Sequence, residues 1–123
     1  MQYCLMYFEA PTETARRTAP DADSYWANWS RYFEMVRGAT DIIEGNPLQP
    51  GETKTLVRSG PGGRVVEDGP FADAREELAG YVIVDVPNID EAIALAEGAP
   101  CASDGGHVEI RPVLMRHAAE QPA

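Results

Sequence analysis

The chain has 123 residues, of which 44% are apolar and 8% aromatic, as is typical of a single globular domain. Its 20 acidic residues outnumber its 10 basic residues, which gives a net charge of −10 at pH 7. So acidic a protein argues against binding to nucleic acid or to an anionic membrane, because both attract positively charged surfaces.

The two cysteines, Cys4 and Cys101, have neither the spacing of a metal site nor that of a disulfide framework. Cys4 is expected to be a small buried hydrophobe in a strand, and Cys101 an incidental thiol in a loop. The sequence begins on a strand-like run, with no signal-peptide pattern and no stretch of about 20 apolar residues. We therefore expect a cytoplasmic protein that does not bind a membrane.

The first part of the chain predicts a strand, a long loop and a helix. Residues 2–9 (QYCLMYFE) are apolar on both faces, as in a central strand. Residues 11–23 are polar and form a long loop of the kind that often serves as a lid or binding segment. Residues 24–37 predict a helix that Gly38 can cap. Its apolar residues follow the helical spacing and form either the core face or, less commonly, the wall of a ligand site: Tyr25, Trp26, Trp29, Tyr32, Phe33 and Val36.

A second strand is expected at residues 40–45. Residues 54–59 and 64–67 then flank Gly60-Pro61-Gly62-Gly63, which predicts a hairpin. These glycines do not indicate a phosphate-binding loop, because the lysine and the following helix of that motif are missing.

The last part of the chain predicts a strand, a helix and a strand. Residues 73–78 suggest a short helical turn, and residues 81–86 form the third main strand. A helix follows, with Asn88 as its N-cap and Glu91 in the position of a capping box. Its expected apolar face consists of Ile89, Ala92, Ile93 and Ala96. Residues 99–106 are expected to be a loop and residues 107–115 the last strand.

A rigid turn is expected at Asp68-Gly69-Pro70-Phe71. Glycine allows positive φ angles, and proline fixes its own φ and restricts the residue before it. The Asp68 carboxylate either caps backbone N–H groups of this turn or is presented to a cavity by it.

This turn is part of a wider pattern that resembles the DGPF branch of the YciI-like (YCII-related) family. The other matching segments are Leu78-Ala-Gly-Tyr81, Val84-Asp-Val86, Pro47-Leu-Gln-Pro50 and the closing Val108-Glu-Ile-Arg-Pro-Val113. The resemblance implies an α+β, ferredoxin-like domain of the dimeric α+β barrel type, with the order β-α-β-β-α-β and an inserted hairpin. The domain would cover residues 1–115, followed by a tail at residues 116–123.

Strand alternation then predicts which side chains lie on the open face of the sheet. Val82, Val84 and Val86 should face the helices together with Val108 and Ile110. The opposite face would carry the polar side chains Tyr81, Asp85, His107, Glu109 and Arg111. This face is either solvated or covered by a second subunit, and because the first strand is apolar on both sides we expect a homodimer.

The candidate site residues come from this face and from the rigid turn. Asp68 and His107 are the candidate acid–base residues, since histidine titrates near neutral pH. Relatives outside this branch are associated with a His–Asp pair, but no histidine precedes His107 in this chain, so that pair is not transferred. Candidate substrate-binding residues are Tyr81, Glu109, Arg111 and Phe71, of which Arg111 suits an anion and Tyr81 a developing oxyanion. No metal or cofactor is expected.

The resulting hypothesis is a cofactor-independent enzyme of the lyase or isomerase type, acting on a small organic substrate in a pocket near the dimer interface. The resemblance implies such chemistry by analogy, for example dehydrochlorination of aromatic compounds. The alternative is a non-catalytic ligand-binding or regulatory protein linked to an extracytoplasmic-function sigma factor. A scaffold without an active pocket is the third possibility.

Overall fold

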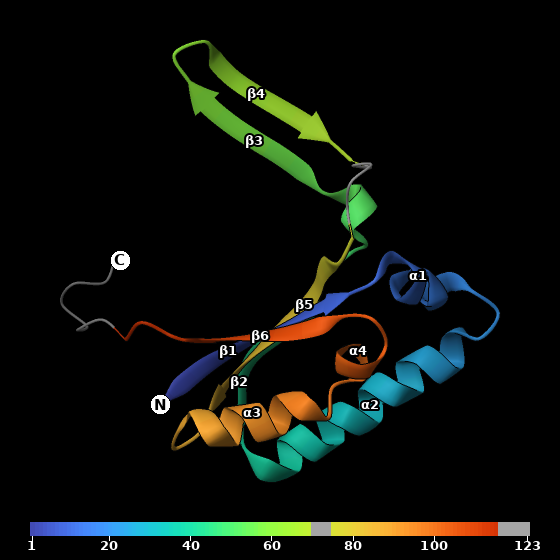
Figure 1. Cartoon of the computed structure of the whole chain (residues 1–123), viewed down its shortest axis with the longest axis vertical. Coiled ribbons are helices and arrows are strands. Elements are labelled where there is room, and N and C mark those ends of the chain that lie inside the picture. Colours follow the sequence, from blue (N-terminus) through green and yellow to red (C-terminus); the bar gives the residue numbers. More distant parts are fainter. Residues whose placement is uncertain (70–74, 116–123) are drawn as a thin grey trace.

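A computed structural model describes residues 1–69 and 75–115, which form a sheet covered on one face by helices (Figure 1). Phe71 and the tail at residues 116–123 lie outside the described residues. The elements in chain order are β1 (Gln2–Glu9), α1 (Pro11–Thr14), the 3₁₀ turn η1 (Ala15–Thr18), α2 (Ala22–Ala39), β2 (Ile42–Pro47), the 3₁₀ turn η2 (Gly51–Thr53), β3 (Thr55–Gly60), β4 (Gly63–Asp68), β5 (Glu77–Asp85), α3 (Ile89–Glu97), α4 (Pro100–Ser103) and β6 (His107–Pro112).

The main sheet has the strand order β2-β5-β1-β6, and each neighbouring pair is antiparallel. Helices α2 and α3 lie on the same side of it (Figure 1). This is the ferredoxin-like α+β arrangement that the sequence predicts. Strands β3 and β4 form a separate two-stranded hairpin that projects from the end of the sheet (Figure 1).

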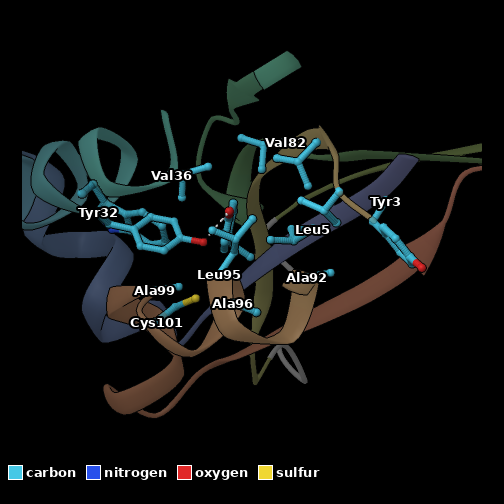
Figure 2. Close-up of a cluster of buried hydrophobic side chains, with 14 of the residues drawn as sticks. Tyr3, Leu5, Tyr32, Val36, Val82, Ala92, Leu95, Ala96, Ala99 and Cys101 are labelled. Carbon is cyan, nitrogen blue, oxygen red and sulfur yellow. Dashed lines mark hydrogen bonds between the residues drawn. The ribbon is translucent and has the colours of Figure 1, made fainter. Parts of the chain in front are cut away.

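The core lies between this sheet and the helices (Figure 2). Alternate residues of β1 are buried toward the helices, namely Tyr3, Leu5, Tyr7 and Glu9. Val82, Val84 and Val86 are buried on the same side, as strand alternation predicts. Burying an aliphatic side chain of this size contributes about 1.5–3 kcal/mol to folding. The buried valines therefore determine which face of each strand is directed toward the helices.

The long helix α2 is amphipathic and buries Tyr25, Trp29, Tyr32 and Val36. The aromatic stripe is therefore mainly a core face, although Trp26 remains 41% exposed. None of the helices in the described part of the chain is long and apolar enough to cross a membrane.

Helix α3 begins at the predicted N-cap, where the Asn88 side chain accepts a hydrogen bond from the Glu91 backbone N–H (3.1 Å). Its predicted apolar face is partly wrong. Leu95 is buried with Ala92 and Ala96, whereas Ile89 and Ile93 are 42% and 41% exposed.

Several predictions about the connections are also wrong. Residues 11–18 form two short helical turns rather than an open loop, and Glu77 and Leu78 belong to β5 rather than to a helical turn. The predicted loop at residues 99–106 contains helix α4, which buries Cys101 to 2% exposure. Cys4 is only partly buried, because it points to the open face of β1.

Candidate functional site

The residues predicted from strand alternation do share the open face of the sheet. Cross-strand pairing places Tyr81 and Glu109 on either side of Met6, and His107 and Arg111 opposite Phe8 and Cys4 respectively. Side chains this close across a sheet are within contact distance. The open face is thus a mixture of apolar residues from the central strand β1 and polar residues from its neighbours.

His107 makes the most specific contacts on this face. Its ring stacks on Phe8 with 4.6 Å between centroids and 4° between planes. Nδ1 lies 2.8 Å from Glu76 Oε2, and Nε2 lies 3.7 Å from Glu109 Oε1. The two carboxylates and the stacked ring fix the imidazole in orientation while its side chain stays 43% exposed.

The other predicted residues lie in different surroundings. The Tyr81 hydroxyl donates to Glu44 Oε1 (2.9 Å), whose strand β2 runs beside β5. Asp68 ends β4 on the projecting hairpin, where its carboxylate accepts a hydrogen bond from the Thr55 hydroxyl (2.8 Å). The contacts in the structure therefore join His107 to Glu76 and Glu109, and Asp68 to Thr55.

A cavity of about 360 Å³ lies on the other side of the sheet, between α2 and strands β2 and β5. Its aromatic lining residues come from β1, α2 and β5, and they include the predicted site residue Tyr81: Tyr7, Tyr25, Trp26, Trp29, Phe33 and Tyr81. The strands contribute residues 45–47 and 79–82, including backbone at Gly45 and Gly80. We refer to this cavity as the helix-side pocket. Its volume is within the range of small-molecule sites, which starts at about 300 Å³.

The charged residues that line the helix-side pocket in the described structure are Arg17 and Arg37, and no carboxylate is among them. This is notable in a chain whose acidic residues outnumber its basic ones two to one. A pocket with aromatic walls and cationic groups suits a flat organic anion.

Behind the pocket lies a buried carboxylate, Glu9, which is 2% exposed. Thr14 donates a hydrogen bond to its Oε1 (3.0 Å), and the Tyr25 hydroxyl lies 2.8 and 2.7 Å from its two oxygens. Arg17 Nη2 lies 3.5 Å from Oε1. A buried charge is stable only when it is paired and hydrogen-bonded, and these three residues meet that requirement.

Arg17 links this cluster to the strands. Its Nε donates to the Tyr25 hydroxyl (3.0 Å), Nη2 donates to the Ala79 carbonyl (3.1 Å) and Nη1 to the Leu48 carbonyl. Its guanidinium also lies over the Trp26 ring, 5.4 Å from the centroid. One side chain therefore ties η1 to α2, to the end of β2 and to β5.

Tyr25 lies between the two regions. It lines the helix-side pocket and also the small cavity that contains Glu9. Burial raises the pKa of Tyr25 above its usual value, with a further contribution from the hydrogen bond to Glu9. The phenol is therefore held as a neutral donor that shares its proton with a carboxylate.

Sequence reasoning did not select Glu9, Arg17 or Tyr25 as site residues. For Glu9 a signal exists, because it continues the alternation Tyr3, Leu5, Tyr7 and so places an acid on a core-facing position. Tyr25 was recognised only as part of the aromatic stripe. Arg17 gives no such signal, since its partners lie 31 and 62 residues away in sequence at Leu48 and Ala79.

The chain resembles two other proteins across much of its length. An uncharacterized protein of Rhizobium meliloti (strain 1021) is 32% identical over 77 residues, which span 62% of each chain. The solved structure of a 5-chloro-2-hydroxyhydroquinone dehydrochlorinase from Burkholderia phenoliruptrix AC1100, in complex with 2,5-dihydroxybenzoquinone, superimposes with a TM-score of 0.55. The match covers 99% of this chain and 100% of that one at 15% identity, which shows that the two share a fold.

The YCII-related domain matches residues 1–116, which are nearly the whole chain. The ferredoxin-like topology and the structural neighbour agree with that match. The protein therefore belongs to the YCII-related domain family.

Proposed function

We propose that this protein is a cofactor-independent enzyme of the lyase or isomerase type, which binds a small aromatic anion in the helix-side pocket. The observation that carries the proposal is the position of Tyr25, whose hydroxyl is hydrogen-bonded to the buried Glu9 while its ring lines the pocket. Acid–base chemistry needs such a group within hydrogen-bond reach of both the ligand and a proton acceptor.

The proton transfer that this arrangement supports is balanced without an oxidant. A hydroxyl or C–H proton of the ligand passes to the Tyr25 oxygen as the Tyr25 proton passes to the Glu9 carboxylate. In an isomerisation the electron pair shifts within the ligand and the proton returns from Glu9 through Tyr25 to a different ligand atom. In an elimination the electron pair expels a leaving anion, and the proton held on Glu9 is afterwards released to water. The name of the structural neighbour, a dehydrochlorinase, supports an elimination of this kind.

The class of ligand follows from the lining. Six aromatic residues favour a planar ring, and Arg37 favours negative charge on it, whereas the charge of Arg17 is already paired with Glu9. A volume of about 360 Å³ is at the low end for ligand sites, so a single substituted ring is the expected size. The neighbour's complex with 2,5-dihydroxybenzoquinone supports a ligand of this class.

The open face has a different role in this proposal. Cys4, Met6, Phe8 and Ile83 are apolar residues of this face that a single chain only partly buries. A second copy packed on it would remove them from water, which is the main driving force for association. We propose a homodimer formed through this face, with His107, Glu109 and Arg111 in the contact.

The experiment that tests the proposal compares the wild type with four variants in a search for turnover. The wild type is incubated with a metabolite extract and with single-ring phenolic acids, and mass spectrometry follows their consumption. Tyr25→Phe should lower kcat/KM by about 100-fold or more, because it removes the proton-transfer group and keeps the ring. Tyr3→Phe is the matched control, since Tyr3 is another buried tyrosine of the core, outside the pocket lining.

Two further variants test whether the reaction takes place elsewhere. His107→Ala tests the open face of the sheet, and Asp68→Asn tests the hairpin. Loss of turnover in these two variants with full activity in Tyr25→Phe would move the acid–base site to His107 and its partner Glu76. A compound that co-purifies unchanged with every variant would instead favour the ligand-binding or regulatory alternative, and a pull-down for a sigma factor would follow.

A further inference from the structure

The β3–β4 hairpin projects from the sheet and points away from α2 and α3 (Figure 1). Along residues 55–68 every side chain is exposed except Leu56, which is partly buried. A two-stranded hairpin with neither face covered is only marginally stable in water. Its fourteen residues would be ordered at a large entropic cost unless something else packs against them.

The hairpin also differs from the rest of the chain in its surface chemistry. Val57, Val65 and Val66 are 61%, 48% and 48% exposed, which is unusual for three valines in one short element. Residues 57–66 contain Arg58 and Arg64 and no acid, a charge of +2. Glu67 and Asp68 follow at the end of β4, so residues 55–68 as a whole carry no net charge and the rest of the chain carries −10. Within the described structure, no ion pair holds either arginine.

The base of the hairpin is held firmly to the sheet. The Gly69 backbone N–H donates to the Lys54 carbonyl (2.8 Å), and Lys54 Nζ lies 2.8 Å from Glu77 Oε1 on β5. A side chain at Gly69 would come within 2.5 Å of the Glu52 carbonyl oxygen, so the backbone segments on either side of the hairpin approach closely. The contacts at the base thus fix the direction in which the hairpin projects. A hairpin with a fixed direction loses less entropy when its outer residues bind a partner.

We propose that the hairpin is a clasp that packs against the acidic body of a second copy of this chain. The partner is another copy because the complementary charge is present in the chain itself, +2 on residues 57–66 against −10 outside the hairpin. The hairpin extends beyond the end of the sheet, away from α2 and α3, so it reaches past the body of its own chain (Figure 1). In a two-fold dimer each copy would contribute one clasp and receive the other. This inference rests on the proposed homodimer and adds a second contact to it.

The test measures dimerisation of the full-length chain by sedimentation equilibrium at low and high salt. Arg58→Gln combined with Arg64→Gln should raise the dimer dissociation constant at least tenfold at low salt and flatten its dependence on salt. The matched control is Arg31→Glu, which also changes the net charge by −2 but lies on the exposed side of α2. It should leave the dissociation constant within about twofold of wild type.

Hydrogen exchange gives an independent measure of the same contact. Amides of residues 55–60 and 63–68 should be protected at concentrations where the dimer forms and should exchange rapidly on dilution to monomer. A double variant with the wild-type dissociation constant and unprotected hairpin amides in a dimer would overturn the clasp and leave the sheet-face dimer intact. A wild type that stays monomeric at every concentration up to about millimolar would overturn both the clasp and the sheet-face dimer. This result would not bear on turnover at Tyr25.

Discussion

At the scale of single residues, Glu9 is a tightly held side chain next to the helix-side pocket. It is buried, ionisable and bonded to Thr14, Arg17 and Tyr25. Under the proposed function such a group acts both on stability and on chemistry, because the same contacts that keep it buried also fix the position of the Tyr25 hydroxyl. Two predictions separate these effects.

Glu9→Gln should lower the free energy of unfolding by about 2–4 kcal/mol, since it leaves the Arg17 guanidinium largely buried without its counter-charge. Urea denaturation followed by circular dichroism measures this value. Glu34→Gln, on the exposed side of α2, is the control and should change it by no more than about 0.5 kcal/mol. An equally small effect of Glu9→Gln would contradict a charged Glu9–Arg17 pair.

Arg37→Gln should weaken binding of an aromatic anion by about 5- to 10-fold and leave a neutral analogue unaffected. The chain's two tryptophans, Trp26 and Trp29, both line the pocket, so their fluorescence reports on its occupancy directly. Titrations with benzoate and benzamide compare anion and neutral ligand. Arg31→Gln, also on α2 but outside the lining, is the matched control, and an identical loss there would remove Arg37 from the site.

At the scale of elements, the strands and the two long helices could be predicted from the sequence, because their signals are local. Period-two burial in β1 and β5, the aromatic spacing in α2 and the Asn88 cap all appear in the structure. Helix α4 was missed because it has only four residues and is held by burial of Cys101 rather than by its own propensity.

The helix-side pocket could not be predicted in the same way. Its walls come from β1, α2, β2 and β5, and only the fold brings these segments together. Strand alternation identified the open face. The aromatic stripe of α2 offered a ligand wall as the less common alternative to a core face, and Tyr25, Trp26, Trp29 and Phe33 of that stripe do line the pocket. The pocket exists because α2 leaves space beside the edge strand β2. The separation between this helix and this strand depends on the tertiary fold and cannot be read from a local sequence pattern.

The layer between the sheet and the helices should be sensitive to alkaline pH. Burial raises the pKa of Cys101 from 9.0 to about 12, and burial likewise raises the pKa of Tyr32 from 10.0 to about 12. Tyr32 also shares a hydrogen bond with the Tyr7 hydroxyl (2.9 Å), and burial raises the pKa of Tyr7 as well.

Between about pH 9 and about pH 12 the unfolded chain releases these protons while the folded chain keeps them, so the free energy of unfolding should fall as pH rises through this window. Urea midpoints at about pH 8 and about pH 10.5 measure the slope. Cys101→Ala should be less stable at pH 8 but show a smaller loss between the two pH values. An unchanged slope in that variant would exclude a contribution from the thiol.

At the scale of the whole molecule, the two faces of the sheet differ in what they contact. The helix face holds the pocket and most of the core, while the open face presents a mixed apolar and polar surface. Under the proposed homodimer the two faces are independent, so a change on one should not be felt on the other.

Met6→Glu should convert the dimer to monomer, because it places a charge in the centre of the open face where Met6 pairs with Tyr81 and Glu109. Size-exclusion chromatography with light scattering gives the mass. Ile93→Glu is the control, since Ile93 is 41% exposed on α3, outside that face. Binding of benzoate should persist in the monomer, and a dimer that survives Met6→Glu would place the contact elsewhere.

The bonds of Arg17 have a consequence for the rates at which a ligand enters and leaves. This side chain holds η1 against the ends of β2 and β5, where it also borders the pocket. The Arg17 guanidinium and the Thr14 hydrogen bond to Glu9 tie this segment to the strands, and a segment held by polar contacts opens more readily than the packed core around it. The rate at which residues 11–18 open would therefore set the upper limit of the rate of ligand exchange. Arg17→Lys loses the planar set of guanidinium donors, so it should raise the association and dissociation rate constants together.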